Sequence, residues 1–247
     1  MALSARHGAL LRLQTEIPRG GPIESAQLAA LGISPALAHH YLKSGWLCRL
    51  GRGVFQFPKD DLRLEGCLKL LEGQIQGFHV GGKTALAWRG FRHNVAALEP
   101  VWLGGQQNVR LPEWFTERFP ARYTTRTPFD SALPAEAGLE PLPDQPEGVR
   151  VSVPERALLE LLNEVGVHQG MEEAQNIVEG LRSLRPEVLA LHLKHCQRVK
   201  AARLCVRWSE QLGLPWAETA RKAASKHLTG SRWSARLKSG TRLSLYG

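Results

Sequence analysis

The segment from Gly77 to Thr84 matches the phosphate-loop pattern G-x-x-x-x-G-K-[ST] at every specified position. Such a loop binds nucleoside triphosphates because its backbone N–H groups and its lysine surround the phosphates, while its hydroxyl holds Mg²⁺. The pattern also requires a buried apolar strand that leads into the loop, and residues 72–76, Glu-Gly-Gln-Ile-Gln, cannot form one. We therefore predict a loop in which Thr84 caps a helix that Gly90 ends. A nucleotide-binding or nucleic-acid-acting enzyme that uses the 77–84 loop is the alternative.

Other residues with chemical potential do not form a recognised catalytic or metal-binding pattern. Four side chains are of types that bind zinc, but their spacing is not that of known zinc sites: His192, His195, Cys196 and Cys205. The adjacent His39 and His40 would point about 100° apart on a helix, so they cannot easily share one ion. The chain contains no GxSxG or HExxH motif, and the acid pair at residues 60–61 fits the first turn of a helix. We predict no catalytic residue, no metal site and no cofactor, and therefore no enzyme.

Basic residues are concentrated at the two ends of the chain. The formal net charge of the 247 residues is +9, and the isoelectric point is about 9.8. Residues 1–57 hold six Lys and Arg against two acids, residues 58–193 hold fourteen against nineteen, and residues 194–247 hold twelve against two. Basic ends that flank an acidic middle favour a polyanion, above all nucleic acid, as the partner. A basic tail that serves solubility or an acidic protein partner is the other interpretation.

The N-terminal segment has the element order of a helix-turn-helix followed by a hairpin. A helix that Gly32 closes is followed at once by a new start, with Ser34 as N-cap, a proline at the first helical position and a helix over residues 35–44. Residues 46–50 and 54–57 then alternate like two strands joined by a Gly-Arg-Gly turn. This pattern predicts a winged helix-turn-helix that binds DNA.

The second helix and the wing would divide the DNA contacts between them. On the helix, these residues would face the major groove: Ser34, Ala36, His39, His40 and Lys43. At the wing, Arg49 and Arg52 would hold phosphates and so fix the register without reading sequence. Arg19, near the start of the preceding helix, is a further phosphate candidate. A winged fold that serves only as a protein–protein adaptor is the alternative, and it predicts no salt-dependent DNA affinity.

Beyond the hairpin, predicted strands alternate with predicted helices. The strands cover residues 100–103, 121–125 and 149–153, and the nearby helices cover residues 84–90 and 154–162. Three later helices are predicted over residues 171–184, 186–197 and 199–212. Residues 128–148, rich in proline, glycine and acids, are expected to form an extended loop.

Basic residues near the start of the last of these helices are spaced to form a stripe. They are Arg198, Lys200, Arg203 and Arg207. The stripe would be a second basic surface, either a second DNA contact or a face for an acidic partner. A solvated helix face without a partner is the alternative.

Three stretches of the chain resemble the AbiEi-type antitoxins of bacterial type IV toxin–antitoxin systems. The first is YLKSGWLCRLGRGVFQFP, residues 41–58, which is similar to the end of the family's recognition helix and its wing. The second is HVGGKTALAWRG, residues 79–90, which is similar to the helix that opens the family's middle domain. This second likeness makes the phosphate-loop match a coincidence. The third and most distinctive stretch is VSVPERALLELL, residues 151–162.

The resemblance implies a repressor of its own operon whose N-terminal winged domain binds inverted or direct repeats in the promoter. It also implies that the C-terminal domain counteracts a cognate toxin that resembles nucleotidyltransferases, directly or functionally. Only the recognition helix and the wing carry over residue by residue. The role of the basic C-terminal residues is therefore left open.

Taken together, the sequence predicts an α+β protein with two parts. A winged helix-turn-helix DNA-binding domain covers residues 1–58, and a mixed α/β antitoxin domain ending in helices covers residues 59–247, with a further boundary near residue 166 left open. No run of eighteen apolar residues occurs, and the N-terminus lacks the features of a signal peptide. We expect a cytoplasmic protein without membrane contact.

Overall fold

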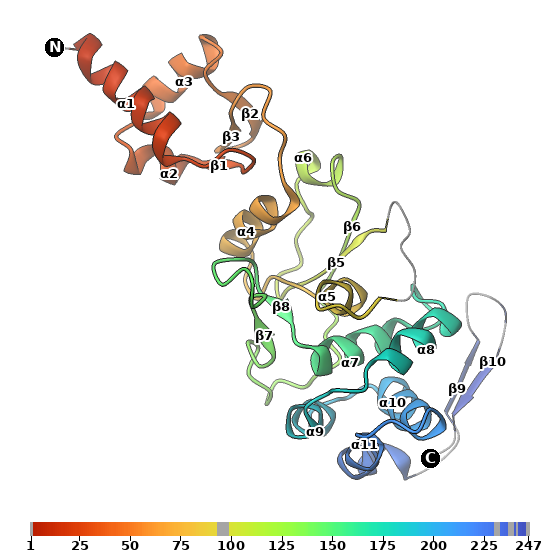
Figure 1. Ribbon diagram of the computed structural model, residues 1–247. Helices are drawn as coiled ribbons and strands as arrows, with labels where there is room; N and C mark the ends of the chain where they lie inside the picture. The colour runs from red at the N-terminus through yellow and green to blue at the C-terminus, as the bar shows by residue number, and fades with distance from the viewer. Residues whose placement is uncertain (1, 93–98, 230–232, 237–239, 241, 246–247) are drawn as a thin grey trace. The chain divides into compact units, whose positions relative to one another are not determined.

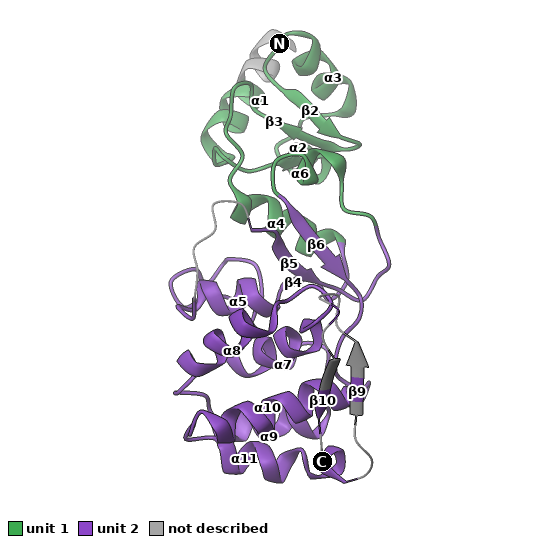
Figure 2. Ribbon diagram, turned by 90° about the vertical axis from the view of Figure 1, so that its right-hand side faces the viewer, with its two compact units in different colours: residues 1–74, 110–119 green, residues 75–109, 120–247 purple. Residues whose placement is uncertain are grey.

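The computed structural model describes residues 2–92, 99–229, 233–236, 240 and 242–245. The chain divides into two compact units (Figure 2). Unit 1 contains residues 1–74 and 110–119, and unit 2 contains residues 75–109 and 120–247. Unit 1 therefore continues past the boundary predicted at residues 58 and 59, and it also takes in a short segment from the middle of the chain. Each unit is described by itself below.

Unit 1 begins with three helices and a small antiparallel sheet (Figure 1). The helices are α1 (Ala2–Glu16), α2 (Ser25–Ala30) and α3 (Pro35–Lys43). The sheet has the strand order β1 (Ile23–Glu24), β3 (Val54–Gln56), β2 (Cys48–Gly51). Apolar side chains from the three helices, from β1 and β3 and from the adjoining loops form one buried cluster, with Leu13, Leu28 and Tyr41 at most 3% exposed. This is the order of elements of the predicted winged helix-turn-helix.

The start of α3 follows from local capping chemistry. Ser34 has extended backbone angles, and its hydroxyl oxygen accepts the N–H of Leu37 at 3.3 Å, as an N-cap does. Pro35 occupies the first helical position, where its missing N–H is not needed. Gly32 adopts a φ of +77°, which lets the chain turn sharply between α2 and α3. The predicted cap and turn are confirmed.

The β2–β3 hairpin is tied to the start of α2 at its tip. Arg49 pairs with Phe55 and Gly51 with Val54, so Arg52 and Gly53 form the turn. The carbonyl of Gly53 accepts two hydrogen bonds from Ser25, from the N–H at 2.9 Å and from the hydroxyl at 3.1 Å. These bonds hold the tip of the hairpin against the first residue of α2.

The remainder of unit 1 consists of α4 (Leu64–Gln74) and the short α6 (Glu113–Thr116). The acid pair at residues 60–61 was expected in the first turn of a helix, but α4 begins only at Leu64. Asp60 instead accepts the N–H of Gly20 at 2.8 Å, which ties the loop before α4 to the turn after α1. Trp114 and Phe115 of α6 are buried.

Unit 2 is built on a mixed five-stranded sheet. The strands in spatial order are β6 (Ala121–Thr124), β5 (Val101–Gly104), β4 (His79–Val80), β8 (Val151–Ser152) and β7 (Leu139–Glu140). The β5–β6 and β4–β8 pairs are parallel, while β4–β5 and β7–β8 are antiparallel. The strands predicted near residues 101, 121 and 151 are present. The central β4 lies inside the segment that matches a phosphate loop, and β7 interrupts the predicted extended loop.

Helices pack on the sheet and on one another in the rest of unit 2 (Figure 1). They are α5 (Gly82–Trp88), α7 (Pro154–Glu164), α8 (Met171–Gly180), α9 (Pro186–Lys194), α10 (Val199–Gln211), α11 (Ala217–Ala223) and α12 (Ser225–Leu228). Buried α7 contacts α5, α9 and α10, so it is the central helix of the unit. After the helices the chain forms an antiparallel hairpin of β9 (Trp233–Arg236) and β10 (Arg242–Leu245). The predicted α+β class is confirmed. The second part was predicted to end in helices, but the β9–β10 hairpin follows them.

Candidate functional site

The groups that a phosphate loop would offer to a nucleotide are engaged inside unit 2. The N–H of Gly82 donates to Oε2 of Glu160 at 2.8 Å, where a phosphate oxygen would otherwise have to lie. The hydroxyl of Thr84 accepts the N–H of Trp102 at 2.9 Å. The predicted capping role of Thr84 is wrong, since α5 begins at Gly82, two residues earlier, with Gly81 as its N-cap.

The lysine of the loop is also engaged. Nζ of Lys83 donates to Oε1 of Glu99 at 2.6 Å and forms a second ion pair with Glu173. Burial lowers the pKa of Lys83, but the hydrogen bonds and charges of the two carboxylates outweigh it and raise the pKa above its ordinary value. Lys83 therefore joins α5 to the segment before β5 and to α8. The two glycines that the pattern specifies, Gly77 and Gly82, have φ values of +68° and +48°, so the local backbone accounts for them.

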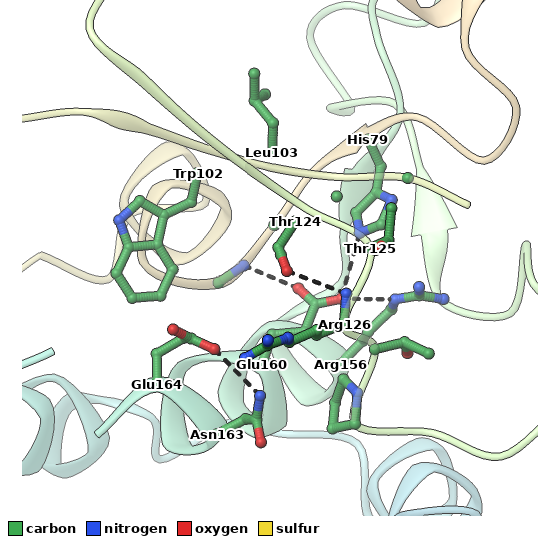
Figure 3. Close-up of a pocket in the computed structure, with 16 residues that line it drawn as sticks. His79, Trp102, Leu103, Thr124, Thr125, Arg126, Arg156, Glu160, Asn163 and Glu164 are labelled. Atoms are coloured by element: carbon green, nitrogen blue, oxygen red, sulfur yellow. Dashed lines mark hydrogen bonds and ion pairs between the residues drawn. The ribbon is translucent and has the colours of Figure 1, made fainter. Parts of the chain in front are cut away.

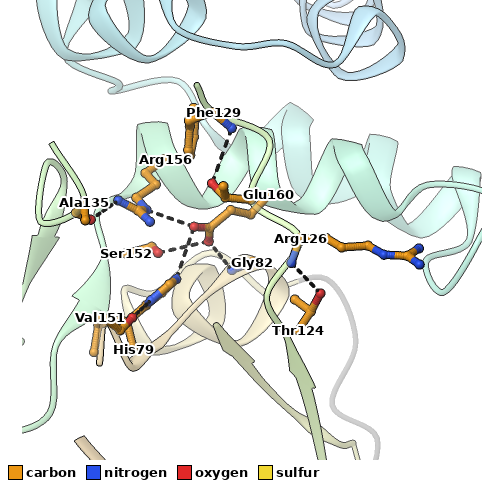
Figure 4. A network of polar contacts seen from close by, with 12 residues as sticks. His79, Gly82, Thr124, Arg126, Phe129, Ala135, Val151, Ser152, Arg156 and Glu160 are labelled. Carbon is orange, nitrogen blue, oxygen red and sulfur yellow. Dashed lines mark hydrogen bonds and ion pairs between the residues drawn. The ribbon is translucent and has the colours of Figure 1, made fainter. Parts of the chain in front are cut away.

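The carboxylate of Glu160 lies at the centre of a polar network (Figure 4). Its Oε2 accepts the N–H of Gly82 at 2.8 Å and the hydroxyl of Ser152 at 2.9 Å. Its Oε1 accepts Nε of Arg156 at 2.9 Å, and Nε2 of His79 lies 3.4 Å from the same oxygen. Two strands, β4 and β8, and two helices, α5 and α7, therefore meet at one side chain.

The network keeps Glu160 ionised. Burial raises the pKa of this carboxyl, but the hydrogen bond from His79 and the positive charge of Arg156 outweigh burial and lower the pKa to about 2. A general base works best when its pKa lies near the operating pH. A carboxylate with four donors around it and so low a pKa is a poor proton acceptor. The arrangement stabilises the fold rather than performing acid–base chemistry.

The network explains the most distinctive stretch of the sequence. Ser152, Arg156 and Glu160 follow one another at intervals of four, which places the last two on one face of α7. Arg156 also donates to the carbonyls of Ala135 at 3.0 Å and Ala137 at 2.7 Å. Sequence reasoning missed this network because His79 and Gly82 reach it only through the sheet. The Ser-x₃-Arg-x₃-Glu spacing was the available signal.

A pocket opens beside the network, between the sheet and α7 (Figure 3). Its polar lining includes His79, Thr124, Arg126, Glu160 and Asn163, and the ring of Trp102 forms one wall. None of these residues was predicted from the sequence to be a binding residue. Their strands and helix are far apart along the chain and are brought together only by the sheet order.

The residues predicted to face DNA on α3 are all on its exposed side. They are Ser34, Ala36, His39, His40 and Lys43. The inner side of the same helix is occupied by Ala38 and Tyr41, which are 7% and 3% exposed. The hydroxyl of Ser34 is used as an acceptor by the cap but still has its proton to donate.

The three predicted phosphate-binding arginines are also exposed. Arg52 is at the tip of the hairpin, and Arg49 is on β2 with its guanidinium carbon 5.8 Å from the centre of the Phe55 ring. Arg19 stacks on Phe57, with 3.9 Å between its guanidinium carbon and the ring centre. Stacking orders a guanidinium without using its N–H donors, which remain available to an anion.

The predicted second basic surface on α10 is only partly a surface. Arg198 and Arg207 are exposed, whereas Lys200 is half-buried and donates to the carbonyl of Val165 at 2.8 Å. Arg203 is 4% exposed and donates to the carbonyls of His227 at 2.7 Å and Leu245 at 2.9 Å. Spacing along the helix suggested that Arg203 belongs to the stripe, but its side chain points into unit 2 and joins the C-terminal elements.

The side chains considered for zinc make other contacts. His192 bonds through Nδ1 to the carbonyl of Val188 at 2.8 Å, and His195 bonds to Asp130 at 2.9 Å. Burial raises the pKa of the Cys196 thiol and of the Cys205 thiol. Among the described residues, no three or more His, Cys, Asp or Glu side chains form a group that could hold a metal ion. Of the helices described, none is both long and apolar enough to cross a membrane.

Comparisons with known proteins cover nearly the whole chain. Residues 6–97 match the family described as "Transcriptional regulator, AbiEi antitoxin N-terminal domain", and residues 98–246 match "Transcriptional regulator, AbiEi antitoxin, Type IV TA system". No curated protein sequence matches the chain. Among solved structures, the chain is similar to the RV2827C protein from Mycobacterium tuberculosis, with a TM-score of 0.62 and 17% identity over 92% of this chain and 83% of that chain. This likeness shows a shared fold.

Proposed function

The chain belongs to the AbiEi antitoxin family of transcriptional regulators of type IV toxin–antitoxin systems, and we propose that it represses its own operon by binding promoter DNA through unit 1. The observation that carries this proposal is the exposed basic and polar surface of α3 and the hairpin. Neither element contains an acid, and of the residues described, none forms an ion pair with Lys43, Arg49 or Arg52. Within the described part of the chain, these cations therefore have no carboxylate to give up when they bind phosphates.

The roles of the residues follow from where they stand. The α3 helix would lie in the major groove, with Ser34 and Ala36 near its N-terminal end and His39, His40 and Lys43 further along. The imidazole of each histidine both donates and accepts hydrogen bonds, which suits base edges. Arg49 and Arg52 would bind the backbone beside the groove. Because Ser25 binds the carbonyl of Gly53, the backbone at the hairpin tip, and with it the position of Arg52, is fixed before DNA binds.

Substitutions in the full-length chain test this proposal best, because a deletion at residue 58 would cut through unit 1. Binding to a duplex with the chain's own upstream sequence is measured at several salt concentrations. Arg52→Ala and Lys43→Ala should each weaken binding and lower the slope of log affinity against log salt by about one, since each variant neutralises one phosphate fewer. Arg182→Ala, at an exposed position of unit 2, is the matched control and should bind normally.

A substitution on α3 separates base reading from backbone binding. His39→Ala should reduce the preference for the upstream duplex over an unrelated duplex, while the salt slope stays close to that of the wild type. If the Arg52, Lys43 and His39 variants all bind both duplexes as the wild type does, unit 1 is not the DNA-binding unit. If the wild type binds neither duplex, the adaptor interpretation replaces the repressor.

We further propose that the chain counteracts a cognate nucleotidyltransferase-like toxin, either directly or functionally. The family description supports an antitoxin role. Co-expression with the gene product encoded beside it tests the proposal through growth rescue. The Arg52→Ala variant should still rescue growth when it is expressed from an unrelated promoter, since the proposed antitoxin activity does not require repression. Failure of the wild type to rescue growth would contradict the antitoxin proposal without affecting the DNA-binding result.

A further inference from the structure

A second cavity of unit 2 has more basic than acidic residues in its lining. It has a volume of about 660 Å³, within the range of about 300 to 1,000 Å³ usual for ligand sites. Four of its lining residues carry a full positive charge, and they are Arg122, Arg126, Arg198 and Lys200. The acidic lining residue is Glu164. The lining also contains the aromatic side chains of His168 and Trp102. The excess of positive charge predicts an anionic ligand.

The sheet order and the start of α10 bring these cations together. Trp102 on β5 and Arg122 on β6 are register partners in a parallel pair, so their side chains lie beside each other on the same face of the sheet. Arg126 follows the end of β6. Arg198 is the N-cap of α10, a helix of 13 residues whose N-terminal end is positive. Two unrelated elements therefore present positive charge to one space.

Arg122 provides a second, independent observation. Its Nη1 atom is buried, and no atom of the described residues lies within hydrogen-bonding distance in a suitable direction. A buried donor without an acceptor is unfavourable, and such atoms are rare in folded proteins. Because Arg122 lines the cavity, a rotation of its guanidinium would bring this N–H to a phosphate oxygen bound there. Lys200 uses a donor on the carbonyl of Val165 and has further N–H donors to offer.

We propose that this cavity binds the phosphate groups of a nucleotide, either free or at the 5′ end of a strand. Guanidinium groups match phosphate geometry through paired N–H donors, and Arg122, Arg126 and Arg198 supply three of them. The half-exposed indole of Trp102 gives a base a surface on which to stack. A concave site with an aromatic wall fits a nucleotide better than an extended acidic peptide. The proposal does not depend on DNA binding by unit 1.

The proposed site does not use the lysine of the phosphate-loop match. Lys83 is paired with Glu99 and Glu173 and is not among the residues that line the cavity. Lys83→Met should therefore leave nucleotide binding unchanged in a protein that melts normally. Loss of binding in this variant, with the arginine variants unaffected, would place the nucleotide at the 77–84 loop and overturn the proposal.

The test is equilibrium binding to the full-length chain, with ATP, adenosine and a short oligodeoxythymidylate with or without a 5′-phosphate as probes. ATP or the 5′-phosphorylated strand should bind with a dissociation constant below about 1 mM, and adenosine and the unphosphorylated strand should bind at least about tenfold more weakly. Tighter binding of ATP identifies a free nucleotide as the source of the phosphate. Tighter binding of the phosphorylated strand identifies a strand end.

Two exposed arginines give variants that should fold normally. Arg126→Ala and Arg198→Ala should each weaken binding of the phosphorylated probe by about tenfold, because each removes a charge-assisted hydrogen bond. Arg122→Gln changes a half-buried position, so its binding data are interpreted only if its melting curve matches that of the wild type. Arg182→Ala is the control of equal charge outside the cavity. Absence of binding by every phosphate probe, unchanged binding in the two exposed variants or an equal loss in the Arg182 variant would each overturn the proposal.

Discussion

At the scale of single residues, Glu160 joins four elements of unit 2. Its two oxygens serve donors from two strands and two helices, and its side chain is 14% exposed. Removing the charge would leave Arg156, which is 5% exposed, without its counter-ion. A buried charge that loses its partner is strongly destabilising. The same carboxylate accepts the Gly82 N–H that a phosphate would bind in a true phosphate loop. One side chain therefore both stabilises unit 2 and occupies this N–H.

The low pKa of Glu160 makes its contribution dependent on pH. Because its pKa is about 2 in the fold and 4.5 ordinarily, the stabilisation is complete above about pH 5 and is lost as the pH falls from 4.5 towards 2. Glu160→Gln should lower the free energy of unfolding by roughly 3 kcal/mol at pH 7 and by progressively less below pH 4.5. Urea unfolding at a series of pH values measures this difference.

The control for this prediction is Glu179→Gln, which removes a carboxylate from an exposed position of α8. It should change the free energy of unfolding by less than about 0.5 kcal/mol at any pH. An equal loss for Glu160→Gln at pH 7 and pH 3 would mean that packing, not charge, determines the role of Glu160.

At the scale of elements, α3 and the β2–β3 hairpin form the DNA-binding surface that we propose. Except for Ser34, the side chains that we propose to face DNA take no part in the contacts that position these elements. The cap at Ser34 sets where α3 begins, and Ser25 sets where the hairpin tip lies. The cations at Lys43, Arg49 and Arg52 are then left exposed on these supports. A surface built in this way is organised before the ligand binds, which reduces the entropy lost on binding.

Ser34 allows the stability of α3 to be separated from DNA binding. Ser34→Ala removes the cap and should lower the free energy of unfolding of unit 1 by about 1 kcal/mol. Ser34→Asp keeps a capping oxygen and should restore that stability, but its negative charge faces the phosphates and should weaken duplex binding. Chemical unfolding and duplex binding of the two variants measure the two effects. Normal duplex binding by the aspartate variant would remove Ser34 from the interface.

At the scale of the whole molecule, unit 1 is discontinuous in sequence. Its residues 1–74 are completed by residues 110–119, which carry the buried Trp114 and Phe115. A Cβ at Gly51 would lie 3.2 Å from the ring of Trp114, so the inserted segment packs closely against the hairpin. Unit 1 therefore depends on residues 110–119, which the predicted division at residues 58 and 59 placed in the second domain.

Phe115→Ala tests this dependence. Phe115 is fully buried beside the rings of Trp114 and Phe119, and its truncation should cost about 3 to 5 kcal/mol. Hydrogen exchange should accelerate in the hairpin of residues 48–56, while α9 and α10 of unit 2 stay protected. Leu191→Ala, at a position that is 44% exposed in unit 2, should change neither region. Faster exchange in α9 and α10 with an unchanged hairpin would contradict the assignment of this segment to unit 1.

The sequence by itself determined what depends on neighbouring residues. The cap at Ser34, the turn at Gly32 and the start of α7 at Pro154 follow from local backbone chemistry, and the structure confirms them. The family resemblance carried by three short stretches is also confirmed by the family matches. The DNA-facing residues remain a prediction, although each of them is exposed as helical periodicity required.

Only the tertiary structure decided what depends on residues far apart along the chain. Sheet order places His79 and Gly82 against Glu160, and Trp102 beside Arg122, although their separation in sequence gives no sign of contact. Burial is likewise a property of the assembled unit, so spacing alone could not show that Arg203 points inward. The phosphate-loop match misleads for the same reason. A local pattern specifies a turn and its glycines, but the fold decides whether an anion or a carboxylate of the chain itself receives the N–H groups.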